Sequence, residues 1–229
     1  KHEGADICTD FACCQAWDSK DDAMKKWNLF KAAGYWAKIE QAVEATRGII
    51  LLYNGEVINP VFHANSGGRT ENAEDVWEGA GVPYLKSVES AGEDACPQYK
   101  VSVLIKCRDF YSKLKESFPD IQVKQDKIQD AIKISGYTPG GRVAMIQIGN
   151  IQLKGTEFRK LFSLRSANFI IEKSGNDALK ITTTGSGHGV GMSQWGANYL
   201  AKTGYTCEEI LAYYYQGVEV EAISDFEGR

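Results

Sequence analysis

The chain has 229 residues, which is enough for one large domain or two small ones with a substantial hydrophobic core. Hydrophobic residues make up 43% of the sequence and charged residues 24%, ordinary values that exclude extensive disorder. The formal net charge is −4 and no basic stripe is present, which excludes nucleic acid as a partner because phosphate neutralisation dominates that affinity. No apolar run approaches the roughly 20 residues that a membrane span requires.

Two helices are predicted in the N-terminal part of the chain. Ser19-Lys20-Asp21-Asp22 has the form of a capping box, with aspartate in place of the usual glutamate. The helix that begins there is expected to end at about Gly34, and a second one is expected over residues 35–47. Gly48 then ends the helical region.

A hairpin is predicted directly after these helices. Residues 49–53 form an apolar strand, and Asn54-Gly55 is typical of a type I′ turn because both residues tolerate a positive φ. The return strand is expected over residues 56–64. Pro60 lies within it and cannot donate to a sheet ladder, so the strand is predicted at a sheet edge or a bulge.

The rest of the chain is predicted to consist mainly of short strands and a few helices. The predicted strands are residues 99–106, 131–135, 142–148, 151–154, 168–172 and 178–183. The predicted helices are residues 108–118, 157–162, 192–201 and 208–215, the last capped by the Thr206…Glu209 box. We therefore expect a mixed α+β fold with largely antiparallel sheets and helices around a substrate cleft. It would be one domain over residues 1–229, or one divided into two lobes with 95–175 mainly β.

The segment Gly185–Gln194 contains four glycines that alternate with other residues, between a strand and a helix. Glycine permits positive φ and close approach of a ligand to the backbone, and a helix N-terminus offers free N–H groups. The segment is either a ligand-binding loop or a tight crossover that carries a surface histidine, His188. A phosphate-binding P-loop is a poor match because the lysine of that motif is missing.

A second glycine-containing loop, His63–Glu71, follows the predicted edge strand. It combines imidazole, amide and hydroxyl groups with a glycine pair, and a turn that closes a hairpin is the alternative interpretation. Trp77, Tyr84 and Trp195 lie near the two loops in the sequence. Aromatic faces hold the apolar faces of sugars, although tryptophans of this kind are also common in hydrophobic cores.

Together the two loops resemble the stage II sporulation protein D family, and the resemblance covers nearly the whole chain. The supporting segments are His63–Glu71, Gly185–Gly196 with the following Ala197–Ala201, Gln41–Gly48 before Asn54-Gly55, and Lys154-Gly155-Thr156 before Leu164-Arg165-Ser166. The resemblance implies a lytic transglycosylase that acts on peptidoglycan glycan strands, preferably denuded of stem peptides, during sporulation engulfment. It also implies stage II sporulation protein P, an amidase, and membrane engulfment proteins as partners. The implied location is extracytoplasmic, between the mother-cell and forespore membranes, with an N-terminal membrane helix outside this chain.

In that family one carboxylic acid protonates the leaving oxygen and then acts as a base, while the C6 hydroxyl of MurNAc attacks C1 to give a 1,6-anhydro product. The family's acid is a glutamate before an alanine-rich helix, upstream of the segment that matches Lys1. We therefore expect the chain to be a fragment without the catalytic element. Glu71 and Glu74 are fallback acids, each expected on an exposed helix face. The chain itself would supply the substrate cleft, formed by His63, Asn65, Ser66, Gly67, Gly187, His188, Gly189, Gly191, Ser193 and Gln194.

A zinc site is predicted near the N-terminus, where Cys8, Cys13 and Cys14 cluster within seven residues, close to His2. Imidazole and thiolate both suit Zn²⁺. Clostridial members of the resembled family carry such a site, and their cysteine before a glutamine corresponds to Cys14, which makes Cys13 the weaker candidate. The expected role of the zinc is structural, and its fourth ligand stays open. Reduced structural cysteines or a disulfide are the alternatives.

Two other functions fit parts of the sequence. The chain could be a non-catalytic glycan-binding module, which would bind glycan without releasing product. It could instead be a zinc-dependent peptidoglycan amidase in which His188 or His63 joins the metal, although no His-Glu-x-x-His pattern is present. Chelator sensitivity of any activity would separate the amidase from the transglycosylase.

Overall fold

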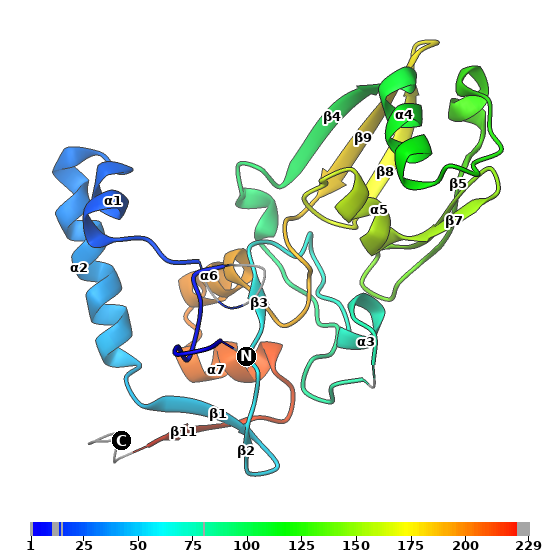
Figure 1. Cartoon of the computed structure of the whole chain (residues 1–229). Helices are drawn as coiled ribbons and strands as arrows, with labels where there is room; N and C mark the ends of the chain where they lie inside the picture. Colours follow the sequence, from blue (N-terminus) through cyan, green and yellow to red (C-terminus); the bar gives the residue numbers. More distant parts are fainter. Residues whose placement is uncertain (1, 11–13, 15, 80, 224–229) are drawn as a thin grey trace. The chain divides into compact units, whose positions relative to one another are not determined.

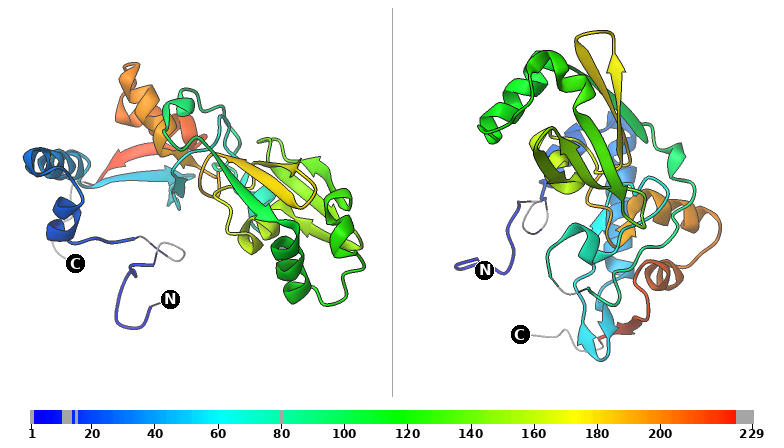
Figure 2. Two further views of the ribbon diagram at one scale, coloured as in Figure 1. Left: turned by 90° about the horizontal axis from the view of Figure 1, so that it is seen from above. Right: turned by 90° about the vertical axis from the view of Figure 1, so that its right-hand side faces the viewer.

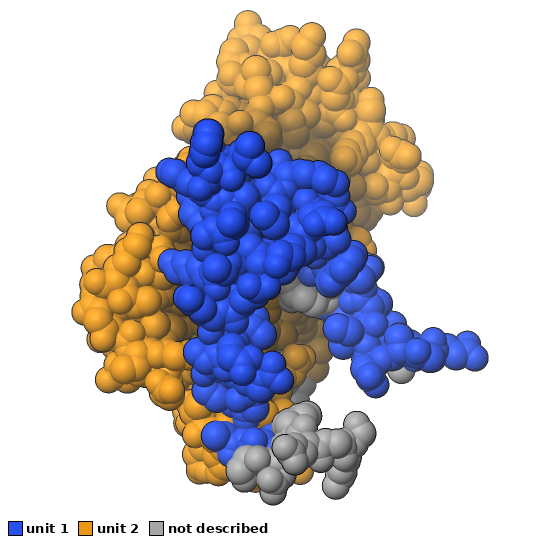
Figure 3. Space-filling view, turned by 90° about the vertical axis from the view of Figure 1, so that its left-hand side faces the viewer, with its two compact units in different colours: residues 1–49, 222–229 blue, residues 50–221 orange. Residues whose placement is uncertain are grey.

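The computed structural model describes residues 2–10, 14, 16–79 and 81–223. The chain divides into two compact units (Figure 3). Unit 1 comprises residues 1–49 and 222–229, and unit 2 comprises residues 50–221. Among the described helices, none combines the length and the apolar character needed to span a bilayer.

Unit 1 contains the helices α1 (Lys20–Lys25) and α2 (Leu29–Ala45) (Figure 1). The predicted cap of α1 is confirmed, because the Ser19 side chain accepts a hydrogen bond from the Asp22 N–H. The predicted boundary at Gly34 is wrong. The break comes earlier, where the Asn28 side chain caps α2, and the helix continues through Gly34 because one interior glycine weakens a helix without ending it.

The predicted hairpin at the start of unit 2 is confirmed. Strand β1 (Ile49–Tyr53) pairs with β2 (Glu56–Val57), and Asn54 and Gly55 have φ values of 53° and 80°, as a type I′ turn requires. A C-terminal strand, β11 (Glu219–Ala222), joins the other edge of β1.

The predicted extent of the return strand is wrong, because the segment around Pro60 separates two strands. Strand β2 ends at Val57, and the chain forms a new strand, β3 (Phe62–His63). Strand β3 pairs in parallel with β10 (Met192–Ser193), which lies at the end of the glycine-rich segment Gly185–Gln194. Because Pro60 has no N–H to donate, pairing with β1 ends before it, and the chain pairs with β10 in a different sheet after it.

The middle of unit 2 contains two antiparallel three-stranded sheets (Figure 2). Their orders are β4-β9-β8 and β5-β6-β7, with the strands β4 (Lys100–Lys106), β5 (Ile132–Tyr137), β6 (Val143–Ile148), β7 (Ile151–Lys154), β8 (Phe169–Ser174) and β9 (Ala178–Thr184). The helical segments there are α4 (Cys107–Ser117), the 3₁₀ segment η2 (Gln125–Asp130) and α5 (Gly155–Leu161). Phe110, Phe158 and Phe162 contact one another in the shared core. The predicted mixed α+β class is confirmed.

A second core in unit 2 joins segments that are far apart in the sequence. Leu51, Leu85, Val190 and Tyr214 are among its buried members. The helices α3 (Ala73–Val76), α6 (Gln194–Lys202) and α7 (Cys207–Tyr214) contribute residues to it, and the 3₁₀ segment η1 (Glu93–Ala95) contacts α6. The predicted Thr206 capping box of α7 is confirmed by both of its hydrogen bonds. The two glycine-containing loops belong to this part of unit 2.

Candidate functional site

The two loops singled out in the sequence pair with each other. Asn65 and Ser186 exchange backbone hydrogen bonds of 3.0 and 2.8 Å, and the Glu71 N–H donates to the Gly189 carbonyl at 2.8 Å. The β3–β10 ladder continues the contact to Ser193, which lies opposite His63. The loops therefore form one continuous backbone surface, although more than one hundred residues separate them in the sequence.

Close contact between the loops depends on glycine. Gly185 has a φ of +78°, and a Cβ there would lie 2.8 Å from the Asn65 carbonyl oxygen. Gly187 has a φ of +113°, and a Cβ there would lie 2.7 Å from the Cβ of His63. Real Cβ atoms do not approach other atoms this closely, so any other residue would push the loops apart.

The backbone of Val190 fixes opposite tautomers of the two loop histidines. His63 Nδ1 donates to the Val190 carbonyl at 3.1 Å. His188 Nδ1 instead accepts from the Val190 N–H at 3.1 Å, so its Nε2 carries the proton and donates to the Phe62 carbonyl at 2.9 Å. The two ring centroids are 5.4 Å apart. Both rings are thus oriented by the main chain of the paired loops.

Burial keeps both histidines neutral at physiological pH. Desolvation is the main cause that lowers the pKa of His63 to about 3, and the nearby His188 and Arg142 add to it. Desolvation likewise lowers the pKa of His188 to about 4, partly opposed by its hydrogen bond to Phe62. At neutral pH the pair offers uncharged imidazole rings and no positive charge.

An exposed tryptophan extends this surface. Trp77 follows α3, its ring centroid lies 5.1 Å from that of His188, and 43% of its surface is exposed. Trp77 also lines a pocket of about 360 Å³, together with Glu74, Thr138, Met145, Lys154 and Thr156. An indole ring beside a polar pocket can hold the apolar face of a sugar while neighbouring groups bond its hydroxyls.

A buried ion pair lies beneath the loops. Arg142 Nη1 donates to Glu71 Oε1 at 3.1 Å, and the Thr138 hydroxyl donates to the same oxygen at 2.8 Å. Glu71 is fully buried and the Arg142 side chain is 2% exposed. Burial raises the pKa of the Glu71 carboxyl, while Arg142 and Thr138 oppose that rise. Among the described residues, Arg142 Nε, Glu71 Oε2 and His63 Nε2 are buried without a hydrogen-bonding partner in the protein.

A second buried carboxylate, that of Glu93, binds the backbone N–H groups of the first loop. Glu93 accepts hydrogen bonds from the backbone N–H groups of Gly67 and Gly68 and from the hydroxyls of Ser66 and Ser90. The Ser90 hydroxyl also bonds the hydroxyl of Tyr214, at 2.6 Å. Consecutive N–H groups around one carboxylate form an anion-binding turn, here occupied by the protein's own side chain.

The predicted cleft residues occupy two different environments. His63, Asn65, Ser66, Gly189, Gly191 and Ser193 are buried and bond or pack within the loops, whereas Gly67, Gly187, His188 and Gln194 reach the surface to some degree. The expectation that Glu71 lies on an exposed helix face is wrong, because it is buried against Arg142. Glu74 does lie exposed on α3, where it pairs with Lys86.

The sequence did not indicate Arg142 or Glu93. Arg142 lies in a turn between two strands, 71 positions from the glutamate with which it pairs. Glu93 acts 25–27 positions away from its partners in the first loop. Single charged residues in loops carry no periodic or local pattern, so only the folded chain reveals their partners. The sole local indication was Gly140-Gly141 beside Arg142, a turn motif without functional meaning by itself.

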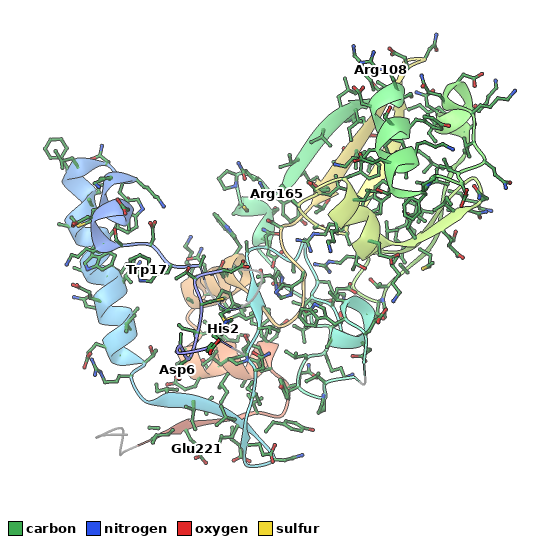
Figure 4. All side chains as sticks on the ribbon, in the orientation of Figure 1. His2, Asp6, Trp17, Arg108, Arg165 and Glu221 are labelled. Carbon is green, nitrogen blue, oxygen red and sulfur yellow. The ribbon has the colours of Figure 1, made fainter. Side chains whose placement is uncertain are left out.

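The N-terminal residues predicted to bind zinc come together in unit 1. Ligand atoms of His2, Cys8 and Cys14 all lie within 4.8 Å of one another, and His2 Nε2 is 3.1 Å from Cys14 Sγ. His2 is labelled in Figure 4. Cys13, the weaker candidate, lies outside the described residues. One imidazole and two thiols so close together suit a tetrahedral Zn²⁺ with a fourth ligand from elsewhere.

Comparisons with known proteins were made over the whole sequence. A model of the family described as "SpoIID: Stage II sporulation protein" matches residues 1–53. Stage II sporulation protein D of Bacillus subtilis (strain 168) is 41% identical over 93% of the chain, and that of Bacillus amyloliquefaciens is 39% identical over 93%. The chain spans 59% of the length of each. A protein named "Amidase enhancer" from Bacillus subtilis (strain 168) is 27% identical over 77% of the chain and 32% of its own length. By these matches the chain is similar to the stage II sporulation proteins of the SpoIID family.

Proposed function

We propose that the chain is the glycan-binding part of a lytic transglycosylase that cleaves MurNAc–GlcNAc bonds of denuded peptidoglycan to 1,6-anhydro products during sporulation engulfment. Two relatives that are about 40% identical carry the name stage II sporulation protein D, which supports a role in sporulation. The structural observation that carries the proposal is the exposed Trp77 ring against His188, beside a polar pocket. That arrangement suits a neutral, hydroxyl-rich ligand.

The structure favours a proton donor other than Glu71. A general acid must reach the glycosidic oxygen, but the Glu71 carboxyl is fully buried and bonded to Arg142 and Thr138. We assign the acid to a glutamate outside residues 1–229. The proposal also includes a location and a partner. The protein would act outside the cytoplasm, between the mother-cell and forespore membranes, anchored by a helix outside this chain. Its partner would be the amidase stage II sporulation protein P.

The glycan-binding role is tested by Trp77→Ala, measured by calorimetric titration with denuded glycan oligosaccharides. Loss of one stacked aromatic ring is expected to weaken binding about tenfold. Trp17→Ala is the matched control, because Trp17 is 72% exposed in unit 1 and lies outside the proposed surface. Equal affinities of Trp77→Ala and the unmodified chain would contradict the proposed surface.

We also propose a structural zinc site formed by His2, Cys8 and Cys14, of the type found in clostridial members of the family. The donor set fits Zn²⁺, because the three ligand atoms already lie within 4.8 Å of one another. A bound zinc ion would crosslink the N-terminal segment and supply no chemistry to the reaction. The fourth ligand would be a water molecule, Cys13 or a residue upstream of His2.

The zinc proposal predicts about one equivalent of metal after gentle purification, measured by mass spectrometry of the metal content. Cys14→Ser is expected to reduce the content below half an equivalent, and chelator should lower the melting temperature of the unmodified chain but not that of Cys14→Ser. Cys207→Ser is the control, because Cys207 is an exposed thiol outside the cluster. Full zinc content in Cys14→Ser would contradict the assigned ligands.

The structure gives little support to the zinc-dependent amidase. His63 and His188 bond the backbone through Nδ1 and, for His188, through both nitrogens. Within the described part of the chain, His2, Cys8 and Cys14 form the one group of His, Cys, Asp or Glu side chains placed to hold a metal. The non-catalytic glycan-binding module stays an alternative, and product analysis distinguishes it.

A further inference from the structure

Arg142 projects from a tight turn between β5 and β6. The Thr138 N–H donates to the Arg142 carbonyl at 2.8 Å, and the Arg142 N–H donates to the Thr138 hydroxyl at 3.0 Å, which fixes the turn. A Cβ on Gly140 would lie 1.7 Å from Glu71 Oε1, so this turn packs directly on the first loop. Strand β6, which follows the turn, contributes Val143 and Ile146 to the core of the two sheets, and Ile134 of β5, which precedes it, packs against that core. The arginine is therefore attached to a rigid part of unit 2.

The guanidinium group binds the first loop at three acceptors. Nη2 donates to the Ser66 carbonyl at 2.8 Å, and Nη1 donates to the Arg69 carbonyl at 3.2 Å and to Glu71 Oε1 at 3.1 Å. A planar fork of N–H donors can satisfy acceptors in several directions at once, which a lysine ammonium cannot do with the same geometry. The arginine thus sets the path of the loop from Ser66 to Glu71.

The same group also contacts the second loop. Gly189 packs against the guanidinium, since a Cβ there would lie 2.2 Å from Nη2 and 2.4 Å from Cζ. Gly189 directly follows His188, and its carbonyl accepts the Glu71 N–H. Arg142 therefore touches both loops where they meet, one residue from the histidine that packs on Trp77.

We propose that Arg142 is a positioning residue for the glycan-binding surface. It acts through Gly189 and the Ser66–Glu71 backbone to hold His188 against Trp77, and it does not contact the glycan. The ligand in this inference rests on the proposed function, whereas the effect of Arg142 on His188 and Trp77 does not. The buried arginine stays charged, so its hydrogen bonds to the first loop persist across the physiological pH range.

The test is Arg142→Lys, followed by NMR of the histidine rings and by titration with denuded glycan oligosaccharides. The sequence contains three histidines, so the ring protons of His188 can be assigned and their ring-current shift from Trp77 read directly. We expect this shift to decrease in Arg142→Lys and the affinity for glycan to fall about tenfold. Arg108→Lys is the control, because Arg108 is an exposed arginine paired with Asp109 (Figure 4).

Thr138→Val gives a second variant if Arg142→Lys does not fold. It removes the hydroxyl that supports both the turn and Glu71 but keeps the guanidinium, so a smaller change of the His188 shift is expected, with a matching smaller loss of affinity. An unchanged His188 shift in the folded variants, or a changed shift with unchanged affinity, would overturn the positioning role. If the unmodified chain fails to bind glycan, the proposed function fails, and the NMR comparison still decides whether Arg142 positions His188.

Discussion

Replacement of Gly191 by alanine is expected to destabilise unit 2 by about 4 kcal/mol, the sum of backbone strain and steric overlap. Gly191 has a φ of +70°, which a residue with a Cβ adopts only at a cost. The added Cβ would lie 2.0 Å from the Val61 carbonyl oxygen. Because that oxygen belongs to the backbone just before β3, the overlap is relieved only if the β3–β10 pairing separates.

Chemical denaturation of the purified chain measures this effect. Gly175→Ala is the matched control, because Gly175 has a similar φ of +63° but no atom lies within 4 Å of its added Cβ. The control is expected to lose about 1–2 kcal/mol from strain alone. Similar losses in the two variants would show that the contact with Val61 is not tight and would contradict the paired-loop geometry.

Acidification is expected to destabilise the chain through His63. Its folded-state pKa of about 3 lies below the ordinary value of 6.5, so the unfolded chain takes up a proton first as the pH falls. Stability is therefore highest above pH 6.5 and decreases between pH 6.5 and 3. At pH 4.5 the loss from this one side chain is about 3 kcal/mol, from about 1.4 kcal/mol for each pH unit below 6.5.

The His63 contribution is isolated by comparing the unmodified chain with His63→Asn. An asparagine amide can donate to the Val190 carbonyl as His63 Nδ1 does, but it does not titrate. Each protein's unfolding free energy is measured at pH 7.5 and at pH 4.5. By the same linkage relation, the decrease between the two pH values should be about 3 kcal/mol smaller in His63→Asn than in the unmodified chain. Equal pH dependence of the two proteins would mean that His63 is not buried in the neutral form.

Most of the secondary structure followed from local sequence patterns, because its causes are local. Asn54-Gly55 could adopt the positive φ values of a type I′ turn, and Thr206 could cap the helix that follows it. The errors came where two local rules competed. Gly34 was expected to end a helix, but the Asn28 cap already determined where α2 begins. Pro60 was expected within a strand, but it separates two sheets.

The candidate site was predictable only in part, for a different physical reason. The glycine-containing loops stand out in the sequence because glycine at close backbone contacts is hard to replace. Their charged supports, Arg142 and Glu93, do not stand out, since each acts on residues far away in the sequence. Burial of Glu71 could not be predicted either, because a buried carboxylate depends on a partner that only the tertiary fold provides.

The proposal that residues 1–229 bind glycan but do not supply the catalytic acid is tested most directly by product analysis. The chain would be incubated with denuded glycan strands, and both bound glycan and released products would be measured by mass spectrometry. The account predicts binding that Trp77→Ala weakens, without 1,6-anhydro products. Robust formation of 1,6-anhydro products by the unmodified chain would contradict it and would place the acid on a carboxyl within these residues.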